Sequence, residues 1–320
     1  MKQKLGKWLS VVLPIALGTY LIIYTYQKFT PAQIVEIRQY FNNANYSYIL
    51  LAVIIAMIGN ASRAYRWKYP LEHMGYKTSF LNNFMAVNIG YVLNLAVPKS
   101  GEISRAVVLK RYNNVPFDKG FGSIVAERII DLIVLSCFMI MAFFLQFDIV
   151  KSFVLDQLPL NELLLYGGFA FGCMMVLLWL YLYSKSKYIL SLKQKVSGLK
   201  EGLFSLYSME KKWQYFAHTI FIWGSYLVTF YITIFVFEET SHLSFGACIS
   251  AFVVGSIAIA FTNSGFGSYP FLLSKILLFY SVQETVGTAF GWIVWTSQMA
   301  VVLLMGLLSF ILLPILNRNK

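Results

Sequence analysis

The chain has 320 residues, of which 58% are hydrophobic and 12% charged, and its mean hydropathy is +0.65. A soluble protein carries about 25% charged residues, so this composition excludes an ordinary soluble enzyme and indicates a polytopic membrane protein. The net charge of +12 would suggest nucleic-acid binding in a soluble protein. In a membrane protein, basic loops instead set orientation and contact anionic lipid headgroups, so we expect no nucleic-acid partner.

The chain begins with a short basic stretch and an apolar run. No small-residue cleavage site follows this run. This pattern predicts an uncleaved first helix. Six segments are long enough for full spans, and they cover residues 8–28, 46–66, 122–147, 163–183, 214–237 and 287–314. Two further apolar regions, 80–112 and 244–283, are interrupted near their middles. The sequence therefore predicts one all-α membrane domain, 1–320, with six full spans and two broken hairpins.

Lys and Arg residues are unevenly shared between the loops. They are frequent in 1–8, 63–80, 98–120, 185–213 and 317–320, and the richest of these, 185–213, holds seven. Segments 238–243 and 284–286 hold none. By the positive-inside rule the basic segments and both termini are cytoplasmic. The arm at 80–97 then enters and leaves on the same side, which predicts a re-entrant hairpin.

The two halves of the chain, 1–160 and 161–320, repeat the order span, span, broken hairpin, span. Three full spans in each half would invert the second half relative to the first. In transporters with inverted repeats, interrupted segments at corresponding positions mark the binding site. An alternative is that the second hairpin forms two true helices, which gives eight spans with the same end orientations.

The first interruption carries a cluster of charges within the stretch VPKSGEISRA. Pro98 ends the apolar arm, and a new helix starting near Gly101 would present free N–H groups and a positive dipole end. Glu102 and Arg105 are three residues apart and share one helix face. The pattern favours a phosphate site with Arg105 as bidentate partner and Lys99 as a diffuse charge. The alternative is an ordinary cytoplasmic turn with a capped helix.

A second group of charges, AERIID, opens the next apolar run. Glu127 and Asp131 are four residues apart on one helix face, with Arg128 three residues before Asp131. Charges near a membrane core are costly and usually face the protein interior, so they indicate a functional site. The alternative is an interfacial cluster that pairs with the basic segment 98–120.

The second interruption, TNSGFGSYP, contains Asn263, Gly265 and Gly267. Its glycines give flexible backbone that a lipid headgroup could approach closely, although a plain turn between two helices would have the same composition. The three histidines are scattered and the three cysteines form no C-x-x-C motif, so we expect no metal site. No phosphate-binding G-x-x-x-x-G-K-[ST] loop is present, so we expect no nucleotide cofactor.

The charged motifs carry a family resemblance. G-E-x-x-R, preceded by a proline, and E-R-x-x-D about twenty residues later resemble the lysylphosphatidylglycerol synthase transmembrane family, also called flippase-like domain proteins, at Pro98, Gly101, Glu102, Arg105, Glu127, Arg128 and Asp131. The resemblance covers essentially the whole chain. Family members often carry P-G-G-x-G-x-x-E near the penultimate apolar segment. Here the stretch 263–267 is similar in character but lacks the proline and the glutamate.

The resemblance implies a function in lipid movement. Bifunctional members add a soluble aminoacyl-transfer domain, whereas this chain ends at Lys320, so we expect a stand-alone member with no catalytic residues. The expected function is that of a flippase-like protein of the bacterial inner membrane, which translocates or handles a lipid with a charged or glycosylated headgroup. Its expected partners are a membrane lipid with an anionic, aminoacylated or polyprenyl-linked headgroup and a separate lipid synthase or glycosyltransferase. The alternatives are an enzyme acting on a phospholipid or polyprenyl-phosphate lipid, and a transporter of a small solute.

Overall fold

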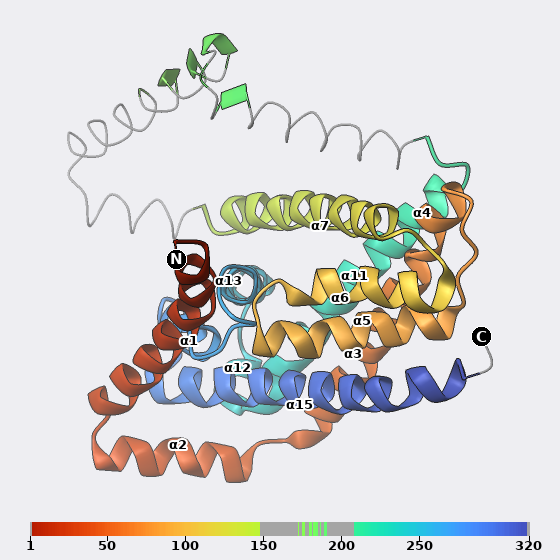
Figure 1. Ribbon diagram of the computed structural model, residues 1–320. Helices are drawn as coiled ribbons and strands as arrows, with labels where there is room; N and C mark the ends of the chain where they lie inside the picture. The colour runs from red at the N-terminus through yellow and green to blue at the C-terminus, as the bar shows by residue number, and fades with distance from the viewer. Residues whose placement is uncertain are drawn as a thin grey trace.

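The computed structural model describes residues 2–147 and 208–318, with scattered positions between 172 and 190 and only the backbone of residues 2–11. All regular structure in these residues is helical, as the sequence predicts. Figure 1 shows that several of the helices lie roughly parallel to α15. The predicted span 163–183 lies largely outside the described residues.

In the described part of the chain, four helical units are long and apolar enough to cross a membrane. They are α3 (Tyr46–Arg66) with α4 (Lys68–His73), α7 (Phe117–Leu145), α11 (Lys212–Thr233) with the 3₁₀ turn η1 (Ile234–Val236), and α15 (Glu284–Leu316). These units confirm four of the six predicted spans. The 33 residues of α15 make a helix about 50 Å long, against which the shorter helices pack.

The N-terminal region contains α1 (Lys2–Lys28), which covers the first predicted span, and a helix that the sequence analysis missed. This is α2 (Pro31–Asn43), in a stretch expected to be a loop. The side chains of Thr30 and Gln33 bond to each other's backbone N–H in a capping box, and a proline occupies the first helical position. Both features favour a helix start, but the apolar pattern that marks the spans is weak here.

Side-chain hydrogen bonds fix α2 against the C-terminal half of the protein. Tyr40 donates a 2.8 Å hydrogen bond to Glu239 of the short helix α12 (Glu238–Ser241). Burial raises the pKa of Tyr40 to about 12, so its hydroxyl remains a donor at neutral pH. Thr285 at the start of α15 donates to Glu36 of α2 at 3.1 Å.

The first broken hairpin consists of α5 (Phe80–Ala96) and α6 (Ser100–Asn113). Lys99 stands at the break in the left-handed backbone region, with φ of 63°. Across the break, the side-chain oxygen of Asn94 accepts a hydrogen bond of 2.7 Å from the backbone N–H of Gly101. This bond satisfies one of the free N–H groups at the start of α6, as an apolar environment requires.

The second broken hairpin consists of α13 (Phe245–Phe261) and α14 (Ser268–Leu278). Ser264, Gly265 and Gly267 in its break have φ of 53°, 80° and 68°. These left-handed conformations favour glycine, which explains why the break is glycine-rich. Both breaks fall where the sequence predicts them.

The two hairpins lie along opposite halves of α15. The first begins beside the C-terminal end of α15, where Asn82 donates to Asn317 at 3.0 Å. The second ends beside the start of α15, where Lys275 contacts Glu284. Figure 1 shows α5 and α6 side by side above the C-terminal part of α15, with α7 above them.

The breaks meet near the middle of α15. Asn263 of the second break donates a 2.9 Å hydrogen bond to the carbonyl oxygen of Leu95 beside the first break, while Trp295 of α15 donates to Ser264 at 2.9 Å. The four arms have 17, 14, 17 and 11 residues and are therefore about 16–26 Å long. Each arm is shorter than the roughly 30 Å hydrocarbon core of a bilayer.

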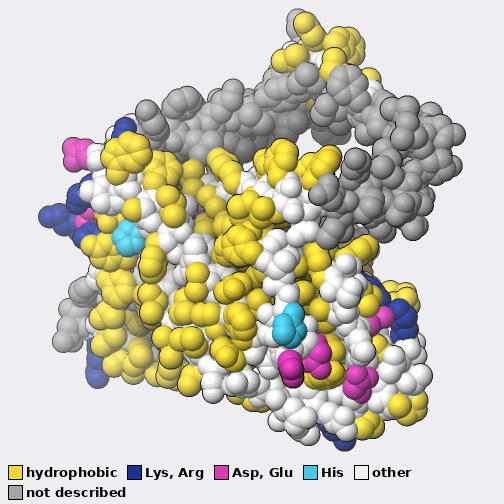
Figure 2. Space-filling view, turned by 180° about the vertical axis from the view of Figure 1, so that it is seen from behind, with side chains coloured by type: hydrophobic (Ala, Val, Ile, Leu, Met, Phe, Trp, Pro, Cys, Tyr) yellow, Lys and Arg dark blue, Asp and Glu magenta, His cyan; other side chains and the backbone are white. Residues whose placement is uncertain are grey.

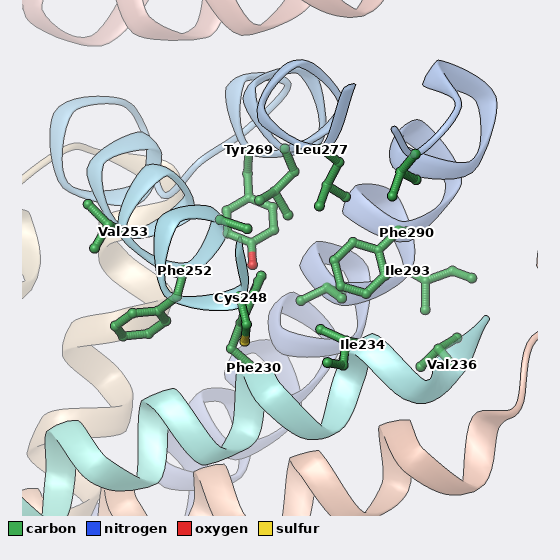
Figure 3. Close-up of a cluster of buried hydrophobic side chains, with 14 of the residues drawn as sticks. Phe230, Ile234, Val236, Cys248, Phe252, Val253, Tyr269, Leu277, Phe290 and Ile293 are labelled. Atoms are coloured by element: carbon green, nitrogen blue, oxygen red, sulfur yellow. The ribbon is translucent and has the colours of Figure 1, made fainter. Parts of the chain in front are cut away.

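Each hairpin has its own apolar core. Figure 3 shows the core under the second hairpin, to which α11, α13, α14 and α15 contribute Phe230, Phe252, Tyr269 and Phe290. A second core packs the first hairpin against α3, α4 and α7 and includes Trp67, Ala86, Leu109 and Ile124. On the surface, Figure 2 shows apolar side chains over the middle of one face and charged side chains towards its two ends. This distribution is typical of a protein that crosses a membrane.

The turn of the first hairpin should depend on the absence of a side chain at Gly101. A Cβ there would meet the Gly90 carbonyl oxygen and the Asn94 side chain, whereas one at Gly122 would meet nothing within 4 Å. We expect Gly101→Ala to destabilise the protein by about 1–3 kcal/mol, in the range of overpacking, and Gly122→Ala, inside α7, to stabilise it by about 0.5–1 kcal/mol. Thermal unfolding of both purified variants in detergent measures the difference, and equal melting temperatures would contradict this account of the turn.

Candidate functional site

Three helices bring five charged side chains together inside the protein. Arg63 and Arg66 come from α3, Arg105 from α6, and Glu127 and Asp131 from α7; each of these residues is between 0% and 8% exposed. We call this group the buried ion cluster. Because isolated buried charges are very costly, the arrangement of partners around each carboxylate decides what the cluster can do.

Glu127 binds all three arginines of the buried ion cluster. Its Oε2 lies 2.9 Å from Nη2 of Arg105, and its Oε1 lies 2.6 Å from Nη1 of Arg63 and 3.4 Å from Nη2 of Arg66. Glu127 therefore joins α7 to both α3 and α6. Both of its oxygens contact guanidinium groups.

Asp131, one helical turn further along α7, completes the cluster. Its Oδ2 lies 3.0 Å from Nη2 of Arg63, and its Oδ1 lies 3.4 Å from Nη2 of Arg66. The indole N–H of Trp223 in α11 also donates to this carboxylate, at 3.3 Å. A fourth helix is thereby tied to the cluster.

Aromatic rings cover the arginines. Arg105 lies 4.2 Å from the ring centre of Trp67, and Arg66 lies 5.1 Å from that of Tyr215. Such cation–π contacts are worth about 0.5–2 kcal/mol each. Arg66 also donates to Thr219 at 2.9 Å. The rings and the carboxylates together hold the guanidinium groups in fixed positions.

Arg63 and Arg66 were not predicted as site residues, because both were counted among the bases of a cytoplasmic loop. They lie instead in the last turn of α3, after the uncharged stretch 46–62. Their spacing of three residues places them on one helix face, opposite the face of α7 that carries Glu127 and Asp131. One sequence feature could have indicated the pairing. Two bases stand at helical spacing at the end of one apolar segment, and two acids stand at helical spacing at the end of another.

Glu102 and Arg128 form an outer pair at the edge of the buried ion cluster. Arg128 Nε lies 3.4 Å from Glu102 Oε1, and Arg128 Nη1 lies 3.7 Å from Asp131. The Arg128 side chain is 38% exposed and that of Glu102 is 20% exposed. Glu102 Oε2 has no hydrogen-bond partner among the described residues. With the outer pair included, four arginines face three carboxylates, which leaves one positive charge.

The break of the first hairpin carries a base, Lys99, that is close in sequence to Glu102 of the outer pair. Pro98 and Lys99 form the turn that precedes Gly101. The Lys99 side chain is exposed and forms no ion pair within the described parts of the chain. Lys99 and Arg128 are therefore the accessible bases among the residues that the sequence singled out.

The residues of the second break divide between two neighbours. Asn263 reaches the first hairpin through its bond to Leu95, as described above. Gly265 N–H donates to the side chain of Thr262 at 3.2 Å. Gly267 instead packs against the backbone of Gly18 in α1. The structure thus joins Asn263 to the first hairpin and directs Gly267 towards α1.

The described residues contain a pair of side chains at the spacing of a catalytic pair, and its serine is buried. No group of three His, Cys, Asp or Glu side chains in this part of the chain could hold a metal ion. Ser62 Oγ and His218 Nδ1 are 2.7 Å apart, which is the spacing of a nucleophile and its base. Ser62, however, is only 7% exposed, so a substrate could not reach its hydroxyl in this conformation.

The fold and the site define a class: a multi-pass membrane protein with two broken hairpins that meet along α15 and with a buried ion cluster. The comparison with known families identifies the family, because the family described as lysylphosphatidylglycerol synthase TM region matches residues 11–315. The chain belongs to this family. The resemblance based on the two charged motifs is confirmed.

Three relatives agree with this assignment. The chain is 28% identical over 153 residues to a UPF0104 membrane protein of Methanocaldococcus jannaschii and 28% identical over 174 residues to one of Pyrococcus horikoshii. It is 29% identical over 131 residues to glycosyltransferase AglD of Haloferax volcanii. The matches cover 47%, 52% and 40% of this chain but only 40%, 50% and 19% of those proteins. The comparison with solved structures gives no significant match.

The buried ion cluster should contribute more to stability than the outer pair. Glu127→Gln would leave three buried arginines with one carboxylate fewer, and breaking a buried pair typically costs about 3–5 kcal/mol. Glu102→Gln changes a partly exposed pair, for which about 0–1 kcal/mol is typical. We therefore expect a large fall in melting temperature for Glu127→Gln and a small one for Glu102→Gln, measured on the purified protein in detergent. Similar falls for both variants would contradict the assignment.

Proposed function

We propose that this protein is a flippase-like translocase for a membrane lipid with an anionic headgroup. The observation that carries the proposal is the meeting of two broken hairpins midway along α15, through Asn263 and Leu95, with the exposed base Lys99 at the first break. In a bilayer, broken backbone is tolerated only where it is buried in protein or lines a water-filled cavity. Transporters use such breaks to form binding sites near the bilayer midplane.

The proposed arrangement in the membrane follows the charge of the loops. The C-terminal end of α15 and the first hairpin would face the cytoplasm, and the second hairpin would enter from the opposite side. Residues 1–160 and 161–320 would then form an inverted repeat around the meeting point. We propose the bacterial inner membrane as the location.

The accessible bases give the proposed mechanism. Arg105 is buried and held by Glu127 and Trp67, so it would act as part of the scaffold. Arg128, whose bond to Glu102 is long at 3.4 Å, could exchange that carboxylate for a headgroup phosphate, and Lys99 would add a second positive charge. Charge-assisted bonds of this kind are worth about 1.5–3 kcal/mol. The buried ion cluster would keep the helices fixed while the headgroup passes the breaks.

The family and one relative support a lipid as the partner. The family description names a synthase of lysylphosphatidylglycerol, which is a lipid, and refers to its membrane region. One relative is named a glycosyltransferase and is matched over 19% of its length. Both names are compatible with a membrane part that works beside a lipid-modifying enzyme. A separate lipid synthase or glycosyltransferase is therefore the partner that we propose.

Leaflet exchange in liposomes tests this function. The purified chain is reconstituted with fluorescent phosphatidylglycerol, phosphatidylcholine or a polyprenyl phosphate, and dithionite then quenches the label in the outer leaflet only. We expect wild-type protein to expose at least one of the anionic lipids fully, while protein-free liposomes protect about half of the label. We expect exchange to be about tenfold slower in Lys99→Gln and in Arg128→Gln, because each loses a charged contact worth about 1.4 kcal/mol or more.

A matched control separates the site from general charge effects. Lys110 is an exposed base at the far end of α6, so Lys110→Gln should exchange lipid at the wild-type rate. Absence of exchange with all three lipids would overturn the translocase assignment, and unchanged rates in both site variants would overturn the assigned site. Lipid recovered in chemically altered form would favour an enzyme, and inhibition by free glycerol phosphate would favour a transporter of a small solute.

A further inference from the structure

A cavity of about 430 Å³ lies between α1, α2, α14 and α15, at the end of the molecule where α15 begins. Its lining is mostly apolar and includes Phe29, Ile34, Phe41, Phe271 and Trp292. A volume of this size is typical of sites for small organic ligands. Gly267 of the second break also lines the cavity, but none of the lining residues belongs to the buried ion cluster.

One buried polar group in the cavity lacks a partner. Thr288 of α15 lines the cavity and is 4% exposed, yet its hydroxyl has no hydrogen-bond partner among the described residues. Thr296, two turns further along, instead donates to the carbonyl oxygen of Trp292 at 2.6 Å, as helix threonines usually do. An unsatisfied buried hydroxyl costs about 1–3 kcal/mol. A ligand oxygen in the cavity would remove this cost.

The rim of the cavity carries a free base. Arg38 of α2 lines the cavity, is exposed, and forms no ion pair among the described residues. The neighbouring charges are already engaged, because Lys28 and Lys275 both contact Glu284, and Glu36 accepts a hydrogen bond from α15. Among the described residues, Arg38 is therefore a lining base without an ion pair. The free guanidinium is suited to a phosphate.

We propose that this cavity binds an anionic phospholipid, with one acyl chain among the apolar side chains, an ester oxygen accepting from Thr288 and the phosphate on Arg38. The apolar lining requires a hydrocarbon chain, and the unpaired arginine requires an anionic headgroup. A lipid satisfies both requirements in one molecule. The site lies at the opposite end of α15 from the start of the first hairpin, and its occupation does not depend on lipid translocation.

A photoreactive lipid locates this site in the full-length protein. Phosphatidylglycerol with a diazirine at the end of one acyl chain is added to the purified chain in detergent, irradiated, and mapped by peptide mass spectrometry. We expect labelling of peptides that contain Phe29, Phe271 or Trp292. Phosphatidylcholine with the same chain should give at least tenfold less labelling of these peptides at equal concentration. Labelling confined to other peptides would overturn the proposal.

Variants separate the two contacts. Arg38→Gln should remove the preference for phosphatidylglycerol over phosphatidylcholine, and the nearly isosteric Thr288→Val should weaken labelling by both lipids about three- to tenfold. Arg318 is an exposed arginine at the other end of α15, so Arg318→Gln should behave as wild type. Equal labelling of wild-type protein by both lipids, or a preference that persists in Arg38→Gln, would overturn the role of Arg38.

One further variant and a competition experiment keep the test decisive. Ile34→Trp should fill the cavity and abolish labelling, and Thr288→Val provides the test if the larger side chain prevents folding. Free glycerol phosphate should not compete with the lipid, and full competition would indicate a site for a soluble anion instead. Lys99→Gln should retain labelling of this cavity, so loss of lipid exchange in that variant and loss of binding here are distinguishable.

Discussion

The structure depends on one constraint: every break and every charge inside this apolar bundle must find its partner within the protein. At the first break, Asn94 binds the N–H of Gly101, and at the second, Trp295 binds the carbonyl oxygen of Ser264. The bond from Asn263 then links the two breaks. The first break is thus closed within its own hairpin, whereas the second break depends on α15 and on the first hairpin for its partners.

The same constraint explains the buried ion cluster. Two carboxylates of α7 and three arginines of α3 and α6 lie among apolar helices, and each carboxylate contacts at least two of the arginines. A buried ion cluster need not make a protein more stable than apolar packing would. Any other register of the helices, however, would leave buried charges without partners, at a high cost in free energy. We infer that it fixes α3, α6 and α7 so that Lys99 and the outer pair of Glu102 and Arg128 remain accessible.

Sequence patterns predict where the helices and breaks of this protein lie better than they predict which helices contact each other. The positions of four long helices and of both breaks follow from apolar runs and from Pro and Gly residues. The motif residues Arg105, Glu127 and Asp131 were singled out by spacing on a helix, and the structure brings them together. Arg63 and Arg66 were missed because position along an apolar segment does not show which helix lies beside which. For the same reason, the bond between the two breaks could not be predicted.

The most direct test of this account is cross-linking between the two breaks. In a background without the three native cysteines, Leu95→Cys and Asn263→Cys are combined and treated in native membranes with a short bis-methanethiosulfonate reagent. The account predicts efficient cross-linking of this pair and none between Leu95→Cys and Ser281→Cys, whose position lies beyond the far end of α14. Absence of the first cross-link, when both cysteines react with a small thiol reagent, would contradict the meeting of the hairpins.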